Sequence, residues 1–399
     1  MSPFHATQPE RSAGGRRSDA AAWHAFRSQS VPGQRLFGLL RSLPGSDHST
    51  VGLSAAMALS DAETLVLLES LEETGLIRPS GPSRFQVTPV GAALRPEWSG
   101  AETRSLQRWY DWGLGTVTAA AELLYPQALR LDAEASTTVR IDAPTTAVAA
   151  SAFLEAEGGN LLDAIGSARV LGLGRYAYQL ADALRGWAWI NPYAGDWVTA
   201  ATAAVSAARA VGGPRESAAA YLCLADAHFL AGDLDLAEEA CMALGANAAR
   251  AGWLSGSASS HANRGGIHHR RGRHEEALRE YLQALELFGA TGRPASQATL
   301  CNNIGGVQLA LGEVHQAVGF HRRALVLFRQ LGSLAGEART LEMLAQAWRA
   351  CGQREAAARG ILQAYMVYGR LGDRVGEART RASAAALRLE NDEDEEPAA

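Results

Sequence analysis

The chain has 399 residues, of which 47% are hydrophobic, and a formal net charge of -5 at pH 7, a composition typical of a globular protein with two or three domains. This slight acidic excess argues against a broad electrostatic surface for nucleic acid. All 37 basic residues are arginines, so a Walker A phosphate loop and Schiff-base chemistry, which both need a lysine, are excluded.

Cysteine usage and hydropathy predict a cytoplasmic protein. The four cysteines lie singly within helical patterns and read as reduced core thiols. The first residues lack an apolar stretch after their arginines, and no run of about 18 apolar residues occurs anywhere. We therefore expect neither export nor a membrane span.

The first folded part is expected to be a small winged-helix domain over residues 33–97. It follows residues 1–32, which are rich in Ser, Ala, Gly and Arg and are predicted to form a disordered tail. Apolar patterns predict helices over 35–43, 50–59 and 61–74, the last one ended by Gly75. A hairpin of 76–77 and 84–87 and a short helix begun by Thr88 and Pro89 complete the outline.

A winged helix raises the alternative of a DNA-binding transcriptional regulator, because the third helix of such a motif normally enters the major groove. Here that helix is acidic, and no arginine occurs from 42 to 77, so DNA phosphates would repel it. The local counter-evidence is Arg78, Arg84 and Arg95 near the hairpin. We favour a module that packs within the protein or forms a homo-oligomer over one that binds DNA.

Residues 98–173 are expected to form a helical linker domain, and residues 174–389 a repeat array. From 214 onward the array keeps a strict period of 40 residues, which is typical of a solenoid of stacked helical hairpins. The repeating positions are Gly232, Gly272, Gly312 and Gly352; Gly252, Gly292, Gly332 and Gly372; and Ala237, Ala277, Ala317 and Ala357. Residues 390–399 are an acidic run that we predict to be a disordered tail.

The small residues of each hairpin resemble those of the tetratricopeptide repeat. A small residue recurs in the first helix at Ala225, Gly265, Gly305 and Ala345, and a late alanine recurs in the second helix at Ala284, Ala324 and Ala364. The resemblance implies an all-α protein whose array is a right-handed solenoid. It also implies that the first helices of the hairpins line a concave groove that binds a protein or peptide segment.

Four upstream segments, 39–95, 109–112, 153–162 and 180–184, are similar to the C-terminal half of actinobacterial signal-transducing regulators of the antibiotic regulatory type. That family joins a DNA-binding domain and an NTPase to a winged helix and a tetratricopeptide array, and the similarity covers 33–389. The NTPase part is absent from this sequence, and Thr88-Pro89 stands where the family offers a His-Asp pair to the nucleotide. The resemblance therefore implies a regulator of gene expression or secondary metabolism that uses no nucleotide cofactor.

Polar residues recur in register on the first helices and are the candidates for a peptide-binding groove. Asparagine offers donors and an acceptor to an extended backbone, and arginine can hold a carboxylate with two hydrogen bonds. The glycine pairs at 265–266 and 305–306 would leave room beside them. The candidate groove residues are Asn263, Thr299, Asn302, Asn303, Arg339 and Arg379.

Other motifs indicate no catalytic, cofactor or metal site. The sequence from Gly172 to Ala177 satisfies G-x-G-x-x-A, but it lies in a helical region without the acidic residue that a dinucleotide fold needs, so we interpret Gly172 as a turn between helices. The histidines of the array lack the spacing of metal ligands, and no nucleophile elbow occurs. A noncanonical biosynthetic enzyme or small-ligand-binding protein remains the third alternative. We interpret Trp187, Trp189, Tyr193 and Trp197 as a packed junction between domains, and for a small hydrophobic ligand this junction is the second choice after the groove.

Overall fold

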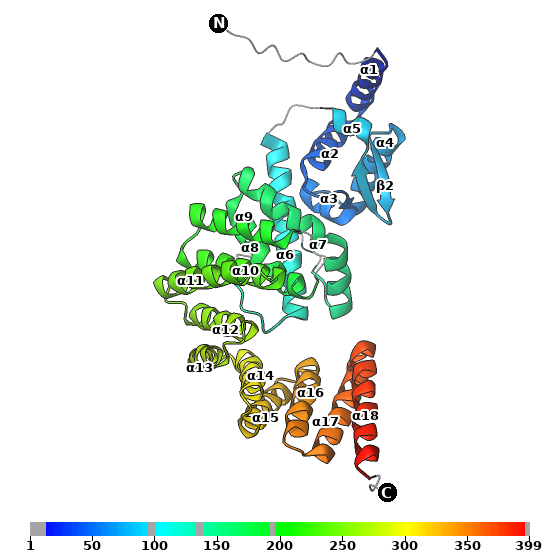
Figure 1. The fold of residues 1–399 in the computed structure, drawn as a ribbon. Coiled ribbons are helices and arrows are strands. Elements are labelled where there is room, and N and C mark those ends of the chain that lie inside the picture. The colour runs from blue at the N-terminus through cyan, green and yellow to red at the C-terminus, as the bar shows by residue number, and fades with distance from the viewer. Residues whose placement is uncertain are drawn as a thin grey trace. The chain divides into compact units, whose positions relative to one another are not determined.

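The computed structural model describes residues 13–94, 100–132, 139, 141, 143–191 and 196–395, and these residues form an all-α protein with a tetratricopeptide-like solenoid (Figure 1). Internal contacts divide the chain into two units, Met1–Val211 and Gly212–Ala399. Each unit buries its own apolar core. The first unit contains a small module of helices and strands followed by four longer helices, and the second contains the repeat array.

The small module has the order helix, strand, helix, helix and hairpin. Its elements are α1 (Ala13–Ser28), α2 (Val31–Ser42), β1 (His48–Ser49), α3 (Thr50–Met57), α4 (Asp61–Glu73), β2 (Ile77–Gly81), β3 (Arg84–Val87) and α5 (Pro89–Ala93). The three strands form an antiparallel sheet in the order β1-β3-β2, with His48 opposite Phe85 and Ile77 opposite Val87. Ser60 and Glu63 form a capping box that begins α4, and Thr88 caps α5.

Four longer helices complete the first unit: α6 (Gly100–Leu124), α7 (Ala147–Val170), α8 (Gly174–Ile190) and α9 (Trp197–Val211). Trp109 and Tyr110 on α6 are the largest fully buried side chains of the described chain, and the hydroxyl of Tyr110 donates to the carbonyl of Ala164 on α7 at 3.0 Å. α3 packs on α6, so the small module and the helical part share one core.

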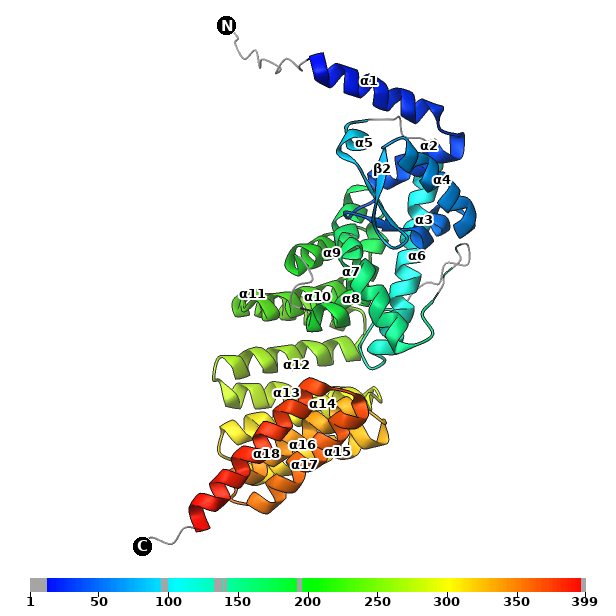
Figure 2. The same cartoon turned by 90° about the vertical axis from the view of Figure 1, so that its right-hand side faces the viewer.

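The second unit consists of nine consecutive helices within the described residues. They are α10 (Pro214–Ala231), α11 (Leu234–Arg250), α12 (Leu254–Arg270), α13 (His274–Ala290), α14 (Pro294–Ala310), α15 (Val314–Gln330), α16 (Leu334–Ala350), α17 (Arg354–Leu371) and α18 (Arg374–Glu395). Each packs against the next, as Figure 2 shows for α11, α12 and α13. We call α10, α12, α14, α16 and α18 the A helices, and α11, α13, α15 and α17 the B helices.

The 40-residue period has a direct structural cause in the turns and in the helix packing. All eight turn glycines take positive φ angles between 62° and 87°, a conformation that a side chain at Cβ disfavours. The four alanines that recur with them, from Ala237 to Ala357, are fully buried near the start of each B helix. Small side chains at these positions let neighbouring helices approach closely.

Several predicted boundaries differ from the observed ones. Helix α1 occupies residues 13–28, which the sequence placed in a disordered tail, and α18 continues to Glu395, inside the predicted acidic tail. Strand β1 has only two residues and was not anticipated. The contacts divide the chain after Val211, so α8 and α9 belong with the first unit and the 40-residue register coincides with the second.

Candidate functional site

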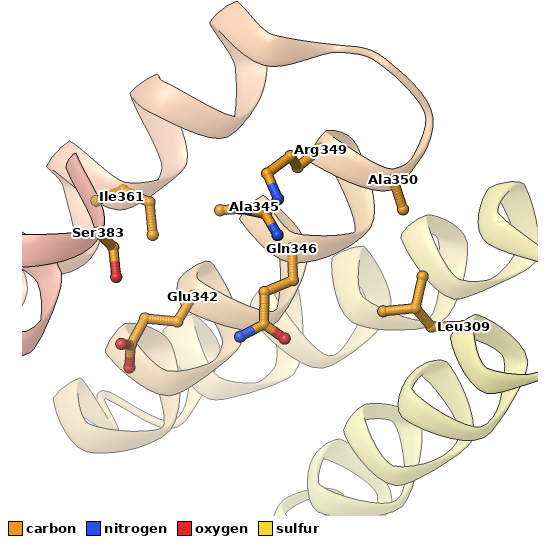
Figure 3. A pocket seen from close by; sticks show the side chains of 8 residues that line it. All are labelled: Leu309, Glu342, Ala345, Gln346, Arg349, Ala350, Ile361 and Ser383. Carbon is orange, nitrogen blue, oxygen red and sulfur yellow. The ribbon is translucent and has the colours of Figure 1, made fainter. Parts of the chain in front are cut away.

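A cavity of about 630 Å3 opens between α14, α16, α17 and α18 (Figure 3). One part of its lining is apolar and the other part offers a carboxylate, an amide, a guanidinium and a hydroxyl. The lining residues are Leu309, Glu342, Ala345, Gln346, Arg349, Ala350, Ile361 and Ser383. All of them except Ile361 belong to A helices, so the cavity lies on the face of the array that these helices form.

The 40-residue register relates this cavity to the candidate residues. Ser383 occupies the position of Asn263 and Asn303 in earlier repeats, and Gln346 occupies the position of Gly306. We call the face that contains these positions the groove face. Sequence reasoning missed Gln346 and Arg349. The register could have identified Gln346, which is 40 residues beyond Gly306, but Arg349 is 40 residues beyond Leu309, which was not a candidate.

Asn303 and Arg339 are the two candidates best placed to meet a ligand. Asn303 is half-buried, and within the described chain its amide has no hydrogen-bond partner. Arg339 is exposed on α16 and likewise donates no hydrogen bond within the described ranges. Thr299 is also exposed, but its hydroxyl donates to the carbonyl of Ala295 one turn earlier at 3.2 Å.

Asn302, in contrast, is part of the core. Its side chain is only 5% exposed, and its Nδ2 donates to Oγ1 of Thr340 on α16 at 2.7 Å. Its Oδ1 lies 3.1 Å from Nδ1 of His321 on α15. Both ends of the amide are therefore used to join three helices, and the prediction that Asn302 lines a binding groove is not supported by its position.

Asn263 has a partner in the preceding repeat. Its Nδ2 donates to Oδ1 of Asp226 on α10 at 2.7 Å. Asp226 is 5% exposed, so the asparagine satisfies a buried carboxylate. Substitution of Asn263 would therefore disturb the stacking of α10 and α12 as well as any ligand contact.

Arg379 joins helices of the array through an exposed ion pair. Its Nε and Nη2 donate to the two carboxylate oxygens of Glu342 at 2.9 and 2.8 Å, and Nη2 also donates to the hydroxyl of Tyr368 at 2.9 Å. Burial raises the pKa of Glu342, but the hydrogen bonds from Arg379 and Tyr368 and the charge of Arg339 outweigh it and hold the pKa below its usual value. Arg379 thus fastens α18 to α16 and is already engaged by a carboxylate.

The two glycine pairs divide into filled and open positions. A side chain at Gly265 would meet the ring of Tyr281 at 2.6 Å, and one at Gly305 would meet the ring of His321 at 2.6 Å. These two glycines therefore admit an aromatic or imidazole ring from the neighbouring B helix. At Gly306 no atom lies within 4 Å of the Cβ position apart from its two chain neighbours and the nearby backbone of its own helix, so this glycine leaves space on the groove face.

The burial of His321 should make the stability of the array depend on pH. Its side chain is 1% exposed, and burial lowers its pKa to about 4, below the value of 6.5 expected in an unfolded chain. The unfolded state therefore binds more protons as the pH falls from 6.5 towards 4, and the array should lose about 3 kcal/mol of stability through this residue over that range.

Urea unfolding of wild type and His321→Gln at pH 7 and pH 4.5 measures this effect. The wild type should lose more stability between the two pH values than His321→Gln, which cannot be protonated. His315→Gln, at an exposed position of the same helix, should behave like the wild type. Equal losses in wild type and His321→Gln would show that His321 is not responsible.

Two other contacts in the array involve histidines. Nδ1 of His261 lies 2.7 Å from Oε2 of Glu280, which also pairs with Arg264, and Nδ1 of His269 lies 3.2 Å from Nδ1 of His274. In the part of the chain that the structure describes, no three His, Cys, Asp or Glu side chains converge in a way that could hold a metal ion.

The G-x-G-x-x-A sequence lies at a turn between two helices, as interpreted from the sequence. Gly172 has φ 72° between the end of α7 and the start of α8. A cavity of about 440 Å3 borders this turn, and beside it Asp111 accepts a hydrogen bond from the hydroxyl of Tyr176 at 2.8 Å. A dinucleotide site would need a βαβ unit around this motif, and the described part of the first unit has none there.

Arg84 is an internal residue of the first unit. Its Nη1 donates to Oε1 of Glu157 on α7 at 2.6 Å, and its Nη2 donates to Oδ1 of Asp47 at 2.7 Å. Asn160 also donates to the carbonyl of Asp47 at 2.6 Å. Of the three arginines that suggested DNA binding, Arg84 is thus engaged with two acids, Arg78 is exposed, and Arg95 lies outside the described residues.

Two tryptophans of the aromatic group near the end of the first unit pack within that unit. Trp187 and Trp197 are each 8% exposed, and the ring of Trp187 fills the space beside Gly158. Trp189 is 44% exposed, and Tyr193 lies outside the described residues.

Among the described helices none alone is long and apolar enough to cross a membrane. Helices α3 and α4 pass that test of length and composition together, with a bend of 106° between them.

Comparisons with known proteins agree with this fold. A family model described as tetratricopeptide repeat matches residues 256–330. Regulatory protein AfsR of Streptomyces griseus is 29% identical over 302 residues, which cover 71% of this chain and 29% of AfsR. The chain thus spans less than a third of the length of this relative.

Two solved structures are similar to this chain over nearly all of its length. Aspartyl phosphate phosphatase F from Bacillus subtilis has a TM-score of 0.51 at 12% identity. The match covers 98% of this chain and 84% of the phosphatase chain. A signal transduction ATPase with a tetratricopeptide repeat sensor from Pyrococcus horikoshii has a TM-score of 0.47 at 16% identity, over 96% of this chain and 57% of its own. The family match and the similarity to AfsR support a regulator-like protein with tetratricopeptide repeats.

Proposed function

We propose that the array binds a peptide or protein segment on its groove face, and that the chain acts in the cytoplasm as a non-catalytic regulator of gene expression or secondary metabolism. The observation that carries this proposal is the cavity of about 630 Å3 between α14, α16, α17 and α18. Its volume and its mixture of apolar and polar walls are those of a ligand pocket. The regulatory role rests on the similarity to AfsR.

We assign Asn303, Arg339 and Gln346 to contact with the ligand. The open position at Gly306 would give the ligand room beside them. The amide groups can donate to and accept from an extended backbone, and the guanidinium can hold an acidic side chain. Asn302 and Arg379 are left out of this set, because the first is buried and the second is bonded to Glu342.

We assign the small module of the first unit to packing or self-association. Its order of helices and strands is that of a winged helix, and α4 takes the place of the helix that reads DNA in such motifs. The exposed acids of α4 and the engagement of Arg84 by Asp47 and Glu157 disfavour DNA as its partner.

A quantitative pull-down from host lysate tests the groove. The variant Asn303→Ala/Arg339→Ala/Gln346→Ala should recover about tenfold less partner than the wild type, because it removes several hydrogen bonds worth roughly 0.5–1.5 kcal/mol each. The control is Gln283→Ala/Arg323→Ala/Gln363→Ala, three exposed positions 40 residues apart on the B helices. Equal recovery by both variants and the wild type would refute the groove assignment.

A further inference from the structure

The outer face of α18, the last helix of the array, has no described helix packed on it (Figure 1). In earlier repeats the equivalent face of an A helix is covered twice. The B helix of the same hairpin packs on it, as the ring of Tyr281 does beside Gly265 of α12. The next A helix packs on it as well, since Asn302 of α14 donates to Thr340 of α16 at 2.7 Å. Helix α18 thus presents to solvent a surface that stacking buries in the earlier repeats.

Equivalent positions differ strongly in exposure between α18 and the earlier A helices. Val375 is 73% exposed, whereas Ala295, at the same position of α14, is 9% exposed. Ala378 is exposed, and its counterparts in the three preceding A helices are 0% exposed: Ala258, Ala298 and Ala338. Ala382 and Ala385 are exposed as well. The end of a repeat array needs a polar outer face to stay in contact with water, and this apolar face therefore favours a partner.

The apolar residues of α18 have the spacing of a helix that pairs with another helix. In the sequence they are separated alternately by three and four positions, as the a and d positions of a heptad are: Val375, Ala378, Ala382, Ala385 and Leu389. Positions with this spacing share one side of a helix. The three central alanines have small side chains, which allow the axes of two helices to approach closely. This face therefore suits a second helix that lies along α18.

The charges of α18 form two blocks of opposite sign along the helix. Residues 374–389 contain four arginines and one acid, and residues 390–395 contain five acids and no base. Arg379 pairs with Glu342, and without it the first block still has three arginines against one acid. Two α18 helices side by side in the same direction would place like charges together. In opposite directions, the arginines of each helix would lie beside the acids of the other, which is the arrangement that electrostatics favours.

We propose that the outer face of α18 docks against α18 of a second copy of the chain, with the two helices antiparallel. Such a contact is self-complementary, as a twofold-symmetric dimer requires. It continues the stacking of the array, because the second α18 takes the place that the next A helix takes in earlier repeats. The exposed residues of this face do not line the cavity, so the dimer is a property beyond the proposed binding of a segment on the groove face.

The size of the contact sets the strength of the dimer. One pair of helices buries less than the roughly 1,200 Å2 at which stable interfaces begin, so the dimer should be weak and should depend on concentration. We expect a dissociation constant in the micromolar range. The two charge blocks should also make the association weaker at high salt.

Sedimentation of the full chain over a series of concentrations tests the dimer. The mass of the wild type should rise from 42.2 kDa towards twice that value as the concentration increases. Ala378→Gln/Ala382→Gln places longer polar side chains on the outer face and should weaken association at least about tenfold. The control Ala246→Gln/Ala358→Gln replaces exposed alanines of α11 and α17 and should associate like the wild type. All four positions are exposed, so circular dichroism should show equal folding.

Charge reversal tests the antiparallel direction. Arg374→Glu and Glu390→Arg, each alone, should weaken the dimer about threefold or more, because each places like charges together in both halves of the twofold contact. The combined variant Arg374→Glu/Glu390→Arg should recover most of the loss. The two positions cannot compensate within one helix, since the residues between them span about 24 Å of helix length.

Three results would contradict the inference. A wild type that stays at 42.2 kDa at every concentration would overturn the dimer. Association that Ala378→Gln/Ala382→Gln leaves unchanged would place the interface elsewhere, such as in the small module, and would overturn the role of α18. Association that the alanine substitutions weaken, without recovery in Arg374→Glu/Glu390→Arg, would overturn the antiparallel pairing.

Discussion

Replacement of Arg84 by alanine is expected to destabilise the first unit by about 3–5 kcal/mol, the cost of leaving a buried charge without its partner. Arg84 is the cation that pairs with both Asp47 and Glu157, and the side chain of Glu157 is only 4% exposed. Without Arg84, the carboxylate of Glu157 would keep a hydrogen bond from the uncharged amide of Asn160, whose length of 3.3 Å is long. The loss should loosen the contact between the small module and α7.

Hydrogen exchange measured by mass spectrometry localises this effect. In Arg84→Ala, the amides of residues 46–50 and 154–161 should exchange faster than in the wild type, and the thermal unfolding of the first unit should shift to lower temperature. Arg78→Ala, which removes an exposed arginine from the same hairpin, should change stability by no more than about 0.5 kcal/mol. Similar behaviour of the two variants would mean that Arg84 is not a structural residue.

Leucine substitutions at the adjacent residues Gly305 and Gly306 are expected to have opposite effects on stability. At Gly305 the new Cβ would lie 2.6 to 2.8 Å from three atoms of the buried His321 ring, so Gly305→Leu should destabilise the array by about 1–3 kcal/mol or more. At Gly306 the Cβ position is open and the backbone is helical, so Gly306→Leu should stabilise it by about 0.5–1 kcal/mol.

Urea unfolding followed by circular dichroism distinguishes the two variants. The midpoint should fall in Gly305→Leu and stay equal or rise in Gly306→Leu. A fall of the same size in both variants would contradict the assignment of Gly306 to an open surface. The control is Gly319→Leu on α15, an exposed helical glycine with no atom within 4 Å of its Cβ position, which should behave like Gly306→Leu.

The helices of the array were predictable because their ends depend on single residues. A glycine with positive φ ends each hairpin helix, and its recurrence every 40 residues is visible in the sequence. The order of helices and the hairpin in the first module were also predictable from apolar runs, from Gly75 at the end of the third predicted helix and from the cap at Thr88. Strand β1 was missed because two residues carry no detectable periodicity.

The candidate site was predictable in register but not residue by residue. Asn302 and Asn303 are adjacent and equally polar, and only the arrival of His321 and Thr340 from later helices buries the first and leaves the second half-exposed. Arg379 is likewise engaged by Glu342, 37 residues earlier in the chain. Such partners depend on which side chains the stacked helices bring together, and a single sequence does not contain that information in its local pattern.

Binding on the groove face is tested most directly by the Gly306→Leu variant, because it fills the groove without removing any side chain. Capture of host proteins by wild type, Gly306→Leu and Gly319→Leu is compared by quantitative mass spectrometry after all three are shown to be equally folded. We predict that partners recovered by the wild type and by Gly319→Leu fall at least about tenfold with Gly306→Leu. Undiminished recovery with Gly306→Leu would contradict binding on this face of the array.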